Sequence, residues 1–205
     1  MIAIVDYGVG NLFSLKSSFE YIGEDVCVSG DPQKIMDCEK ILLPGVGAFE
    51  DAARKLYESK LYDTVIREAE KGKYVFGICL GMQMLLDRSF EYGEHKGLGL
   101  ISGDVCPISE DIPEGLKIPH IGWNGLVFPK EREKHPIFKY VNEGDCVYFV
   151  HSYHAKNCGE SIIASAEYGG MLTAAVAREN VMGTQFHPEK SGRTGLDILK
   201  AFCEL

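Results

Sequence analysis

Short apolar runs typical of β-strands alternate with amphipathic helical patterns through the first half of the chain. The patterns predict strands over 2–5, 26–28, 41–43 and 74–76, and helices over 11–22, 49–57 and 61–71. Parallel strands need crossover connections, which are usually helices. The alternation therefore predicts an α/β fold with a mostly parallel sheet, covered by helices on both faces.

The pattern changes after about residue 97, where short β-like runs are separated by Gly, Pro and Asn and a final helix is expected over 194–202. This change predicts an antiparallel β extension in the C-terminal half. A chain of 205 residues can bury one good core. With no internal repeat or linker, we expect residues 1–205 to form a single domain.

Charge and composition limit the classes of partner. The net charge is −9, with 30 acidic and 21 basic residues, and the basic residues form no run, so nucleic acid is not an expected partner. No segment approaches the roughly 18 apolar residues of a membrane span, and the start "MIAIVDYG" lacks a basic region before its apolar run. We therefore expect a cytoplasmic protein without membrane contact. Its seven cysteines contain no C-x-x-C pair and are expected to be reduced thiols.

The stretch "YVFGICLGMQMLL" places Cys79 between Gly77 and Gly81, where a strand pattern becomes a helical one. Small residues on both sides permit strained backbone angles and close packing, as in the strand-turn-helix elbow that presents a nucleophile. The amide groups at a helix N-terminus favour a thiolate, the reactive form of cysteine. The alternative is a buried cysteine in a tight turn.

A nucleophilic cysteine needs a base, and six histidines are candidates. In "TQFHPEKS", His187 and Glu189 are two residues apart, which on an extended segment points both side chains the same way. Pro188 between them favours a bend at the end of a strand. The carboxylate could then hold the tautomer of the imidazole. Seen alone, H-P-E also fits a strand-end turn with a solvated glutamate.

Three further motifs have competing interpretations. "DYGVGNLF" begins like a dinucleotide-binding loop, but Phe13 stands where the third glycine belongs, so that fingerprint is incomplete. In "LLPGVGAF", Val46 lies between two glycines after a strand, as in a plain tight turn. His151 and His154 in "HSYH" could be a metal pair, but residues three apart on one strand face opposite sides. We expect neither a metal nor a cofactor.

Taken together, G-I-C-L-G-M-Q at 77–83, P-G-V-G upstream and H-P-E-K near the end resemble the class I, triad-type glutamine amidotransferases. "DYGVGN", "LPGVGAF", "PHIGWN", "YFVHSY" and "QFHPEKS" resemble the branch of this family that serves histidine biosynthesis. The resemblance spans the chain from first strand to last helix. It implies a type 1 amidotransferase domain in which Cys79 attacks glutamine, His187 is the acid and base, and Glu189 orients His187. Glutamate and ammonia would be formed through a thioester.

Elbow geometry makes the Leu80 N–H the first donor to the oxyanion, and the resemblance makes Val46 N–H the second. The resemblance also implies substrate contacts and a heterodimer with a cyclase subunit, a (β/α)₈ barrel, that takes the ammonia. The implied substrate contacts are Gly47, Gln83, His151, Ser152 and Tyr153. The implied interface residues are Asn11, Trp123, Asn124, Tyr148 and Lys190.

Other functions remain open on the sequence. A cysteine hydrolase of the peptidase or deglycase kind, acting alone, would use the same elbow, although the distal H-P-E and Gln83 argue against it. A catalytically silent binding module would not need all three triad residues. Ammonia could also go to a different acceptor, such as a surface sugar, in a paralogous system.

Overall fold

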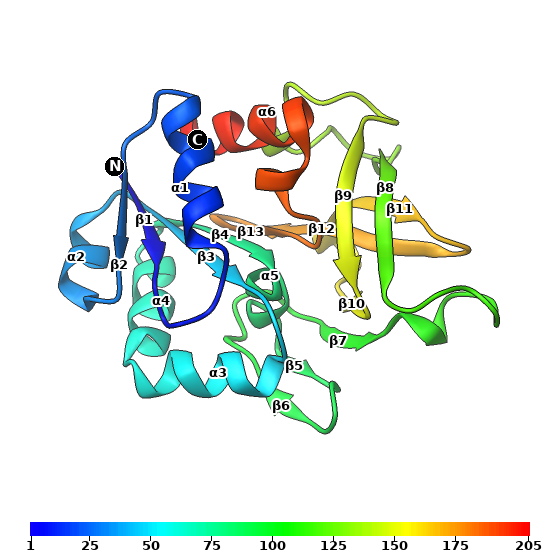
Figure 1. Cartoon of the computed structure of the whole chain (residues 1–205), viewed down its shortest axis with the longest axis horizontal. Coiled ribbons are helices and arrows are strands. Elements are labelled where there is room, and N and C mark those ends of the chain that lie inside the picture. The colour runs from blue at the N-terminus through cyan, green and yellow to red at the C-terminus, as the bar shows by residue number, and fades with distance from the viewer.

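The computed structural model describes all residues, 1–205, and contains a nine-stranded sheet and a second sheet of four strands (Figure 1). The first five strands across the large sheet are parallel: β2 (Val26–Ser29), β1 (Ile2–Val5), β3 (Lys40–Gly45), β4 (Tyr74–Cys79) and β13 (Val181–Thr184). The other four are antiparallel: β12 (Met171–Arg178), β11 (Ile162–Glu167), β8 (His120–Val127) and β9 (Cys146–His151). The α/β class and the antiparallel extension are confirmed. The description "mostly parallel" holds only for the first half of the sheet.

Helices cover both faces of the parallel half (Figure 1). On one face lie α1 (Leu12–Tyr21) and α6 (Gly192–Cys203), and on the other α2 (Pro32–Asp37), α3 (Phe49–Glu58), α4 (Leu61–Glu70) and α5 (Leu80–Met84). Within β1, Ile2 and Ile4 belong to one core, and Ala3 and Val5 to the other. Burial on both faces explains why these strands read as unbroken apolar runs.

The expected helices are present, with ends that differ by one or two residues, and Asn11 caps α1 by accepting a hydrogen bond from Ser14 N–H (3.3 Å). Helix α2 was not predicted. It has only six residues, and its start is marked by Asp31, which accepts from Gln33 N–H (2.9 Å), and by Pro32 in the first turn. A helix this short shows no clear periodicity, so the cap and the proline were the only signals.

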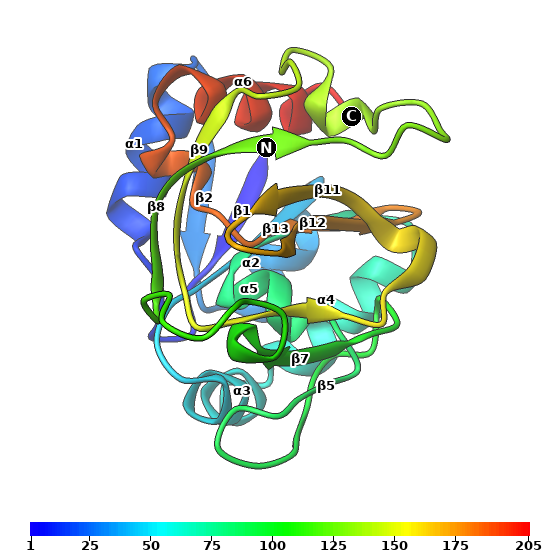
Figure 2. The same ribbon diagram turned by 90° about the vertical axis from the view of Figure 1, so that its right-hand side faces the viewer.

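The small sheet is separate from the antiparallel extension of the large sheet. It has the order β10 (Tyr153–Lys156), β7 (Asp104–Pro107), β5 (Arg88–Ser89) and β6 (His95–Lys96). Figure 2 shows β5 and β7 below the strands of the large sheet. Only Ser152 separates β9 from β10, so the chain leaves the large sheet at that residue. His151 and His154 therefore lie on different strands, and the argument from residues three apart on one strand was wrong.

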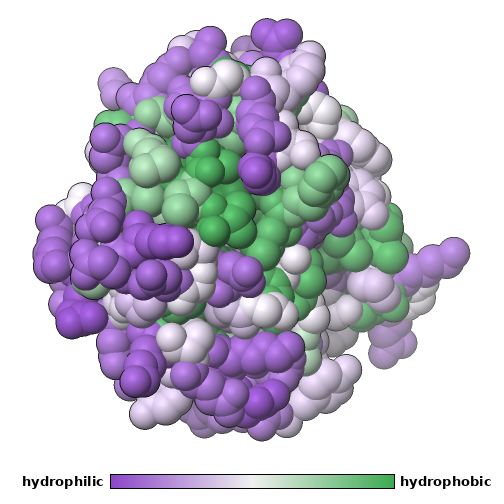
Figure 3. All heavy atoms as spheres, turned by 60° about the vertical axis from the view of Figure 1, so that its left-hand side comes forward, coloured by the Kyte–Doolittle hydropathy of each residue, from purple (hydrophilic) through white to green (hydrophobic).

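The surface is mixed, and Figure 3 shows one face on which hydrophobic atoms form a continuous area bordered by hydrophilic side chains. Among the large apolar side chains, Ile121 and Trp123 on β8 are exposed by 57% and 55%. None of the helices has the length and apolar character needed to cross a bilayer.

Candidate active site

Cys79 is the last residue of β4, and α5 begins at the next residue. Its backbone (φ 55°, ψ −112°) lies at positive φ, which is rare for a residue with a side chain and typical of a strained functional turn. The predicted elbow is therefore present, but the strain lies on Cys79 itself. Gly77 and Gly81 are needed for close packing instead, because a Cβ on Gly81 would collide with the Leu43 carbonyl oxygen and one on Gly77 with the Gly81 backbone.

His187 follows β13 in a turn that is tied to β9. Its N–H donates to the Tyr148 carbonyl (3.0 Å), and the Ser191 hydroxyl donates to the His187 carbonyl (2.6 Å). Pro188–Lys190 forms a 3₁₀ turn that brings Glu189 Oε1 to 2.7 Å from His187 Nδ1. The predicted contact is present. His187 itself is extended (φ −98°, ψ 100°), and the bend expected at Pro188 is a 3₁₀ turn that brings the carboxylate back to the ring.

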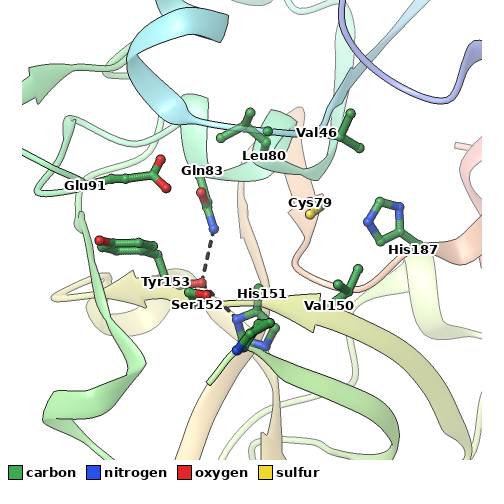
Figure 4. Close-up of a pocket in the computed structure, with 12 residues that line it drawn as sticks. Val46, Cys79, Leu80, Gln83, Glu91, Val150, His151, Ser152, Tyr153 and His187 are labelled. Carbon is green, nitrogen blue, oxygen red and sulfur yellow. Dashed lines mark hydrogen bonds between the residues drawn. The ribbon is translucent and has the colours of Figure 1, made fainter. Parts of the chain in front are cut away.

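The charge state of His187 follows from its neighbours. Burial alone would lower its pKa, but interactions with Cys79 and Glu189 raise the pKa of His187 to about 9. At neutral pH the ring is therefore protonated, and its Nδ1–H donates to Glu189. The side chains of His187 and Glu189 are only 3% and 1% exposed, which limits screening of this pair by water. Figure 4 shows the ring beside the Cys79 sulfur, as a cysteine–histidine nucleophile requires.

A cavity of about 300 Å³ opens at the elbow (Figure 4). It has the size of a site for a small ligand. Every residue proposed from the sequence to bind substrate or stabilise the oxyanion lines it, together with Cys79 and His187. The complete lining is Val46, Gly47, Cys79, Leu80, Gln83, Glu91, Pro119, Val150, His151, Ser152, Tyr153 and His187.

The glycine loop lies directly against the elbow. Gly45 pairs with Cys79 in the β3–β4 register, and the Tyr7 hydroxyl donates to the Pro44 carbonyl (2.7 Å), which anchors the start of the loop. Beyond this anchor, the Val46 N–H forms no hydrogen bond within the chain, its side chain is 41% exposed, and Gly47 has φ 95°. The Val46 N–H therefore has no hydrogen-bond partner within the chain that would fix its direction.

The histidines of the "HSYH" segment have different surroundings. His151 faces the cavity, and its Nδ1 lies 2.8 Å from the Tyr153 carbonyl, which can only accept, so this nitrogen carries a proton. Burial lowers the pKa of His151 to about 3, so the ring is neutral. His154 contacts Asp111 instead (2.8 Å) and does not line the cavity. The structure groups no three His, Cys, Asp or Glu residues in a way that could hold a metal ion.

Two residues of the site were missed in the sequence. Glu91 lines the cavity, and its carboxylate accepts from Phe49 N–H (2.5 Å) at the start of α3, where no N-cap side chain does so. Gln185 is completely buried, and its Nε2 lies 3.7 Å from Cys79 Sγ. Glu91 lies on a loop without a motif, so nothing marked it. Gln185 is the first residue of the motif "QFHPEKS", which was the available signal, but no role was assigned to it.

The expected interface residues fall into two groups. Trp123 and Tyr148 pack edge to face across β8 and β9 (5.9 Å between ring centroids), and Lys190 Nζ lies 6.0 Å from the Tyr148 ring. Asn124 uses its amide within the chain, donating to a carbonyl of β11 (2.8 Å), and Asn11 caps α1. The first three residues thus form a cluster, while the two asparagines also have structural contacts.

Comparison with known proteins gives a match along the whole chain. The family model described as glutamine amidotransferase class-I matches residues 3–204. A protein of Sulfurimonas denitrificans named imidazole glycerol phosphate synthase subunit HisH is 48% identical over 206 residues, which cover 100% of this chain and 98% of the relative. Proteins of the same name from Caldanaerobacter subterraneus subsp. tengcongensis and Methanosarcina acetivorans are 45% and 47% identical, with the same coverage.

Solved structures agree on the fold. A crystal structure described as a glutamine amidotransferase superposes with a TM-score of 0.76 at 17% identity, covering 99% of this chain and 97% of the other. The structure of PurLQS from Thermotoga maritima gives a TM-score of 0.75 at 21% identity, again covering 99% and 97%. At these identities the comparison concerns the arrangement of the sheet and helices alone.

Proposed function

The chain belongs to the class-I glutamine amidotransferase family, and on this basis we propose that it is the glutaminase subunit of an imidazole glycerol phosphate synthase. It hydrolyses glutamine to glutamate and ammonia and passes the ammonia to a synthase partner in histidine biosynthesis. The observation that carries the proposal is Cys79 at a strained elbow beside the buried His187–Glu189 pair, at the floor of one small cavity. The proposal treats residues 1–205 as one amidotransferase type 1 domain.

In the first half of the reaction, the Cys79 thiolate attacks the carboxamide carbon of glutamine. The protonated His187 gives its proton to the departing nitrogen, the C–N bond breaks, and ammonia leaves a thioester on Cys79. The raised pKa of His187 keeps a proton available for this transfer at neutral pH. Glu189 holds the Nδ1–H, so that the Nε2 side of the ring faces the reaction.

In the second half, neutral His187 removes a proton from water, which attacks the thioester. The C–S bond breaks, glutamate leaves, and the thiolate–imidazolium pair is restored. Both halves pass through an oxyanion, for which we propose Leu80 N–H and Val46 N–H as donors. The unbonded Val46 N–H and the neighbouring Gly47, at φ 95°, support a loop that a partner can reorient to switch activity.

We propose that the other cavity residues hold the amino-acid end of glutamine. Glu91 supplies a carboxylate, which suits an ammonium group, and Ser152 and Tyr153 supply polar groups where the chain crosses between the two sheets. Gln83, neutral His151 and Gly47 complete the wall. Free glutamine is small enough for a cavity of this volume.

The partner is proposed to be a cyclase subunit of the (β/α)₈-barrel type, bound as a heterodimer in the cytoplasm. Support for a partner comes from the relatives, each of which is named as a synthase subunit. The exposed Trp123 packs against Tyr148 on β9, and the Tyr148 ring lies 6.0 Å from Nζ of Lys190, which is on the turn after His187. Asn11 and Asn124 are assigned to the same interface. Ammonia released at Cys79 would then have a short path to the partner.

Two other interpretations predict different behaviour. A cysteine hydrolase acting alone would not release glutamate from glutamine, and a silent binding module would show no turnover that depends on Cys79. The test is glutamate release from glutamine by wild type and Cys79→Ala, each with and without the cyclase. We expect release by wild type, stimulated by the partner, and none by Cys79→Ala. Equal release by both proteins, or none by wild type with the partner bound, would contradict the proposal.

A further inference from the structure

Gln185 is a buried amide that faces the nucleophile. It lies one residue beyond β13, is completely buried, and its backbone N–H donates to the Ala174 carbonyl (2.8 Å). Its side-chain Nε2 lies 3.7 Å from Cys79 Sγ, a normal distance for a donor to sulfur because sulfur is larger than oxygen. The sulfur therefore has a neutral amide donor near it in addition to the His187 ring.

The polarity of this amide is set by its neighbours. The Tyr153 backbone carbonyl can only accept, so the Gln83 atom 3.1 Å from it must be Nε2. The same nitrogen lies 2.9 Å from Gln185, so the Gln185 atom that it faces must be Oε1. The other end of the Gln185 amide, which points at Cys79, is then the NH₂ group. A backbone carbonyl thus determines, through two glutamine side chains, that a donor faces the sulfur.

We propose that Gln185 is a catalytic residue that donates a hydrogen bond to Cys79 Sγ and stabilises the thiolate. The inference rests on the proposed function only in treating Cys79 as the nucleophile. A hydrogen bond to an anionic acceptor is stronger than one to a neutral acceptor, so the bond favours the thiolate over both the thiol and the thioester. It acts in the resting enzyme, and again when the C–S bond breaks and the electron pair returns to sulfur.

The hydrogen-bonded pair of Gln83 and Gln185, called here the glutamine relay, also connects the substrate cavity to the nucleophile. Gln83 and Tyr153 line the cavity, whereas Gln185 does not. Glutamine bound against Tyr153 therefore contacts the same backbone segment that orders the relay. An ordered Tyr153 carbonyl keeps Gln83 in place, and Gln83 keeps the NH₂ group of Gln185 directed at the sulfur.

The test is the pH dependence of Cys79 alkylation by iodoacetamide, followed by peptide mass spectrometry so that each cysteine is resolved. Gln185→Met retains most of the volume and removes the donor. We expect the pH midpoint of alkylation to rise by about one unit, which slows the reaction roughly tenfold below the midpoint. Alkylation at high pH, where the thiolate is fully formed in both proteins, should be unchanged.

Thr184→Val is the matched control. Thr184 is also completely buried, and its hydroxyl donates to the Phe186 carbonyl (3.1 Å), not to Cys79. Its removal disturbs the same segment without removing a donor from the sulfur, so the midpoint should stay at the wild-type value. A midpoint that rises equally in Thr184→Val would overturn the assignment to Gln185.

If Gln185→Met fails to fold, the pH midpoint of Cys79 alkylation in Gln83→Met tests the role of Gln185 instead. Without Gln83, the Gln185 amide loses the contact that fixes its polarity, so the midpoint should rise in the same direction by a smaller amount. Wild-type midpoints in the folded variants would refute the role of Gln185. Iodoacetamide does not need the glutamine site, so a wild type without glutaminase activity would refute the proposed function and leave this measurement intact.

Discussion

His187 Nδ1 and Glu189 Oε1 lie 2.7 Å apart, although only a proline separates the two residues in the chain. The other carboxylate oxygen, Glu189 Oε2, is buried and has no hydrogen-bond partner. The carboxylate therefore forms one hydrogen bond, with His187, and no second hydrogen bond that would draw it away from the ring. Its arrangement suits a group whose task is to orient and stabilise a protonated ring.

This arrangement predicts that substitutions of the three triad residues reduce activity by different amounts. In Glu189→Gln, the amide oxygen can still accept from His187 Nδ1–H, and the amide nitrogen takes the position that has no partner, so orientation persists while the charge is lost. His187→Ala should reduce kcat/KM for glutamate release about as much as Cys79→Ala, whereas Glu189→Gln should retain more activity. Near-normal turnover by His187→Ala would move the base to another histidine.

The titration of His187 predicts a dependence of stability on pH. Its pKa is about 9 in the folded protein, against about 6.5 in an unfolded chain. The protonated ring therefore stabilises the fold fully below about pH 6.5, and this contribution is lost as the pH rises through about 9, by up to roughly 3 kcal/mol. Urea unfolding between these limits should show the free energy of unfolding falling in wild type relative to His187→Ala. Parallel curves for the two proteins would contradict this prediction.

Much of the fold could be predicted from residue patterns, for a physical reason. Strands such as β1 and β4 are buried on both faces and leave continuous apolar runs, and the helices between them keep one apolar face. The shortest strands of the small sheet could not be located from the sequence, because β5 and β6 have two residues each and no periodicity can show in two residues. Their positions depend on pairing with distant segments of the chain.

The same limit applies to the site. Cys79, His187 and Glu189 stand in short motifs, so they could be proposed as members of one site from the sequence. Glu91 reaches the site through tertiary packing and lies in no motif, whereas Gln185 is the first residue of the motif "QFHPEKS" but its side chain reaches Cys79 only through the packing of β13 against β4. The strain expected from the glycines falls on Cys79 itself, because the reversal from β4 into α5 occurs at that residue.

Close packing at the elbow predicts that Gly81→Ala destabilises the fold. The added Cβ would meet the Leu43 carbonyl of the neighbouring strand, and neither backbone can move easily. We expect a loss of about 1–3 kcal/mol in the free energy of unfolding, measured with urea. Gly122→Ala is the control, since a Cβ there meets no atom closer than 3.8 Å. Equal stability of the two variants would mean that the elbow tolerates a side chain.

A glutamine analogue with a thiol-reactive group should label Cys79 selectively. All seven cysteines are free. Burial raises the pKa of Cys158 and of Cys203 to about 12, which suppresses their reactivity. Cys146 is exposed and is the natural competitor, but it does not line the cavity. Peptide mass spectrometry should find the label on Cys79, and excess glutamine should protect Cys79 alone. Labelling spread evenly over several cysteines would argue against the site.

The central claim is that this chain liberates ammonia at Cys79 for use by a partner. Its most direct test is product formation by the complex with the cyclase, assembled from wild type or Cys79→Ala and supplied with glutamine or with ammonium salt at alkaline pH. The variant should form no product from glutamine and as much as wild type from ammonium, because neutral ammonia reaches the acceptor without the nucleophile. If the assembled Cys79→Ala complex fails with both nitrogen sources, Cys79 does more than hydrolyse glutamine, and the account is wrong.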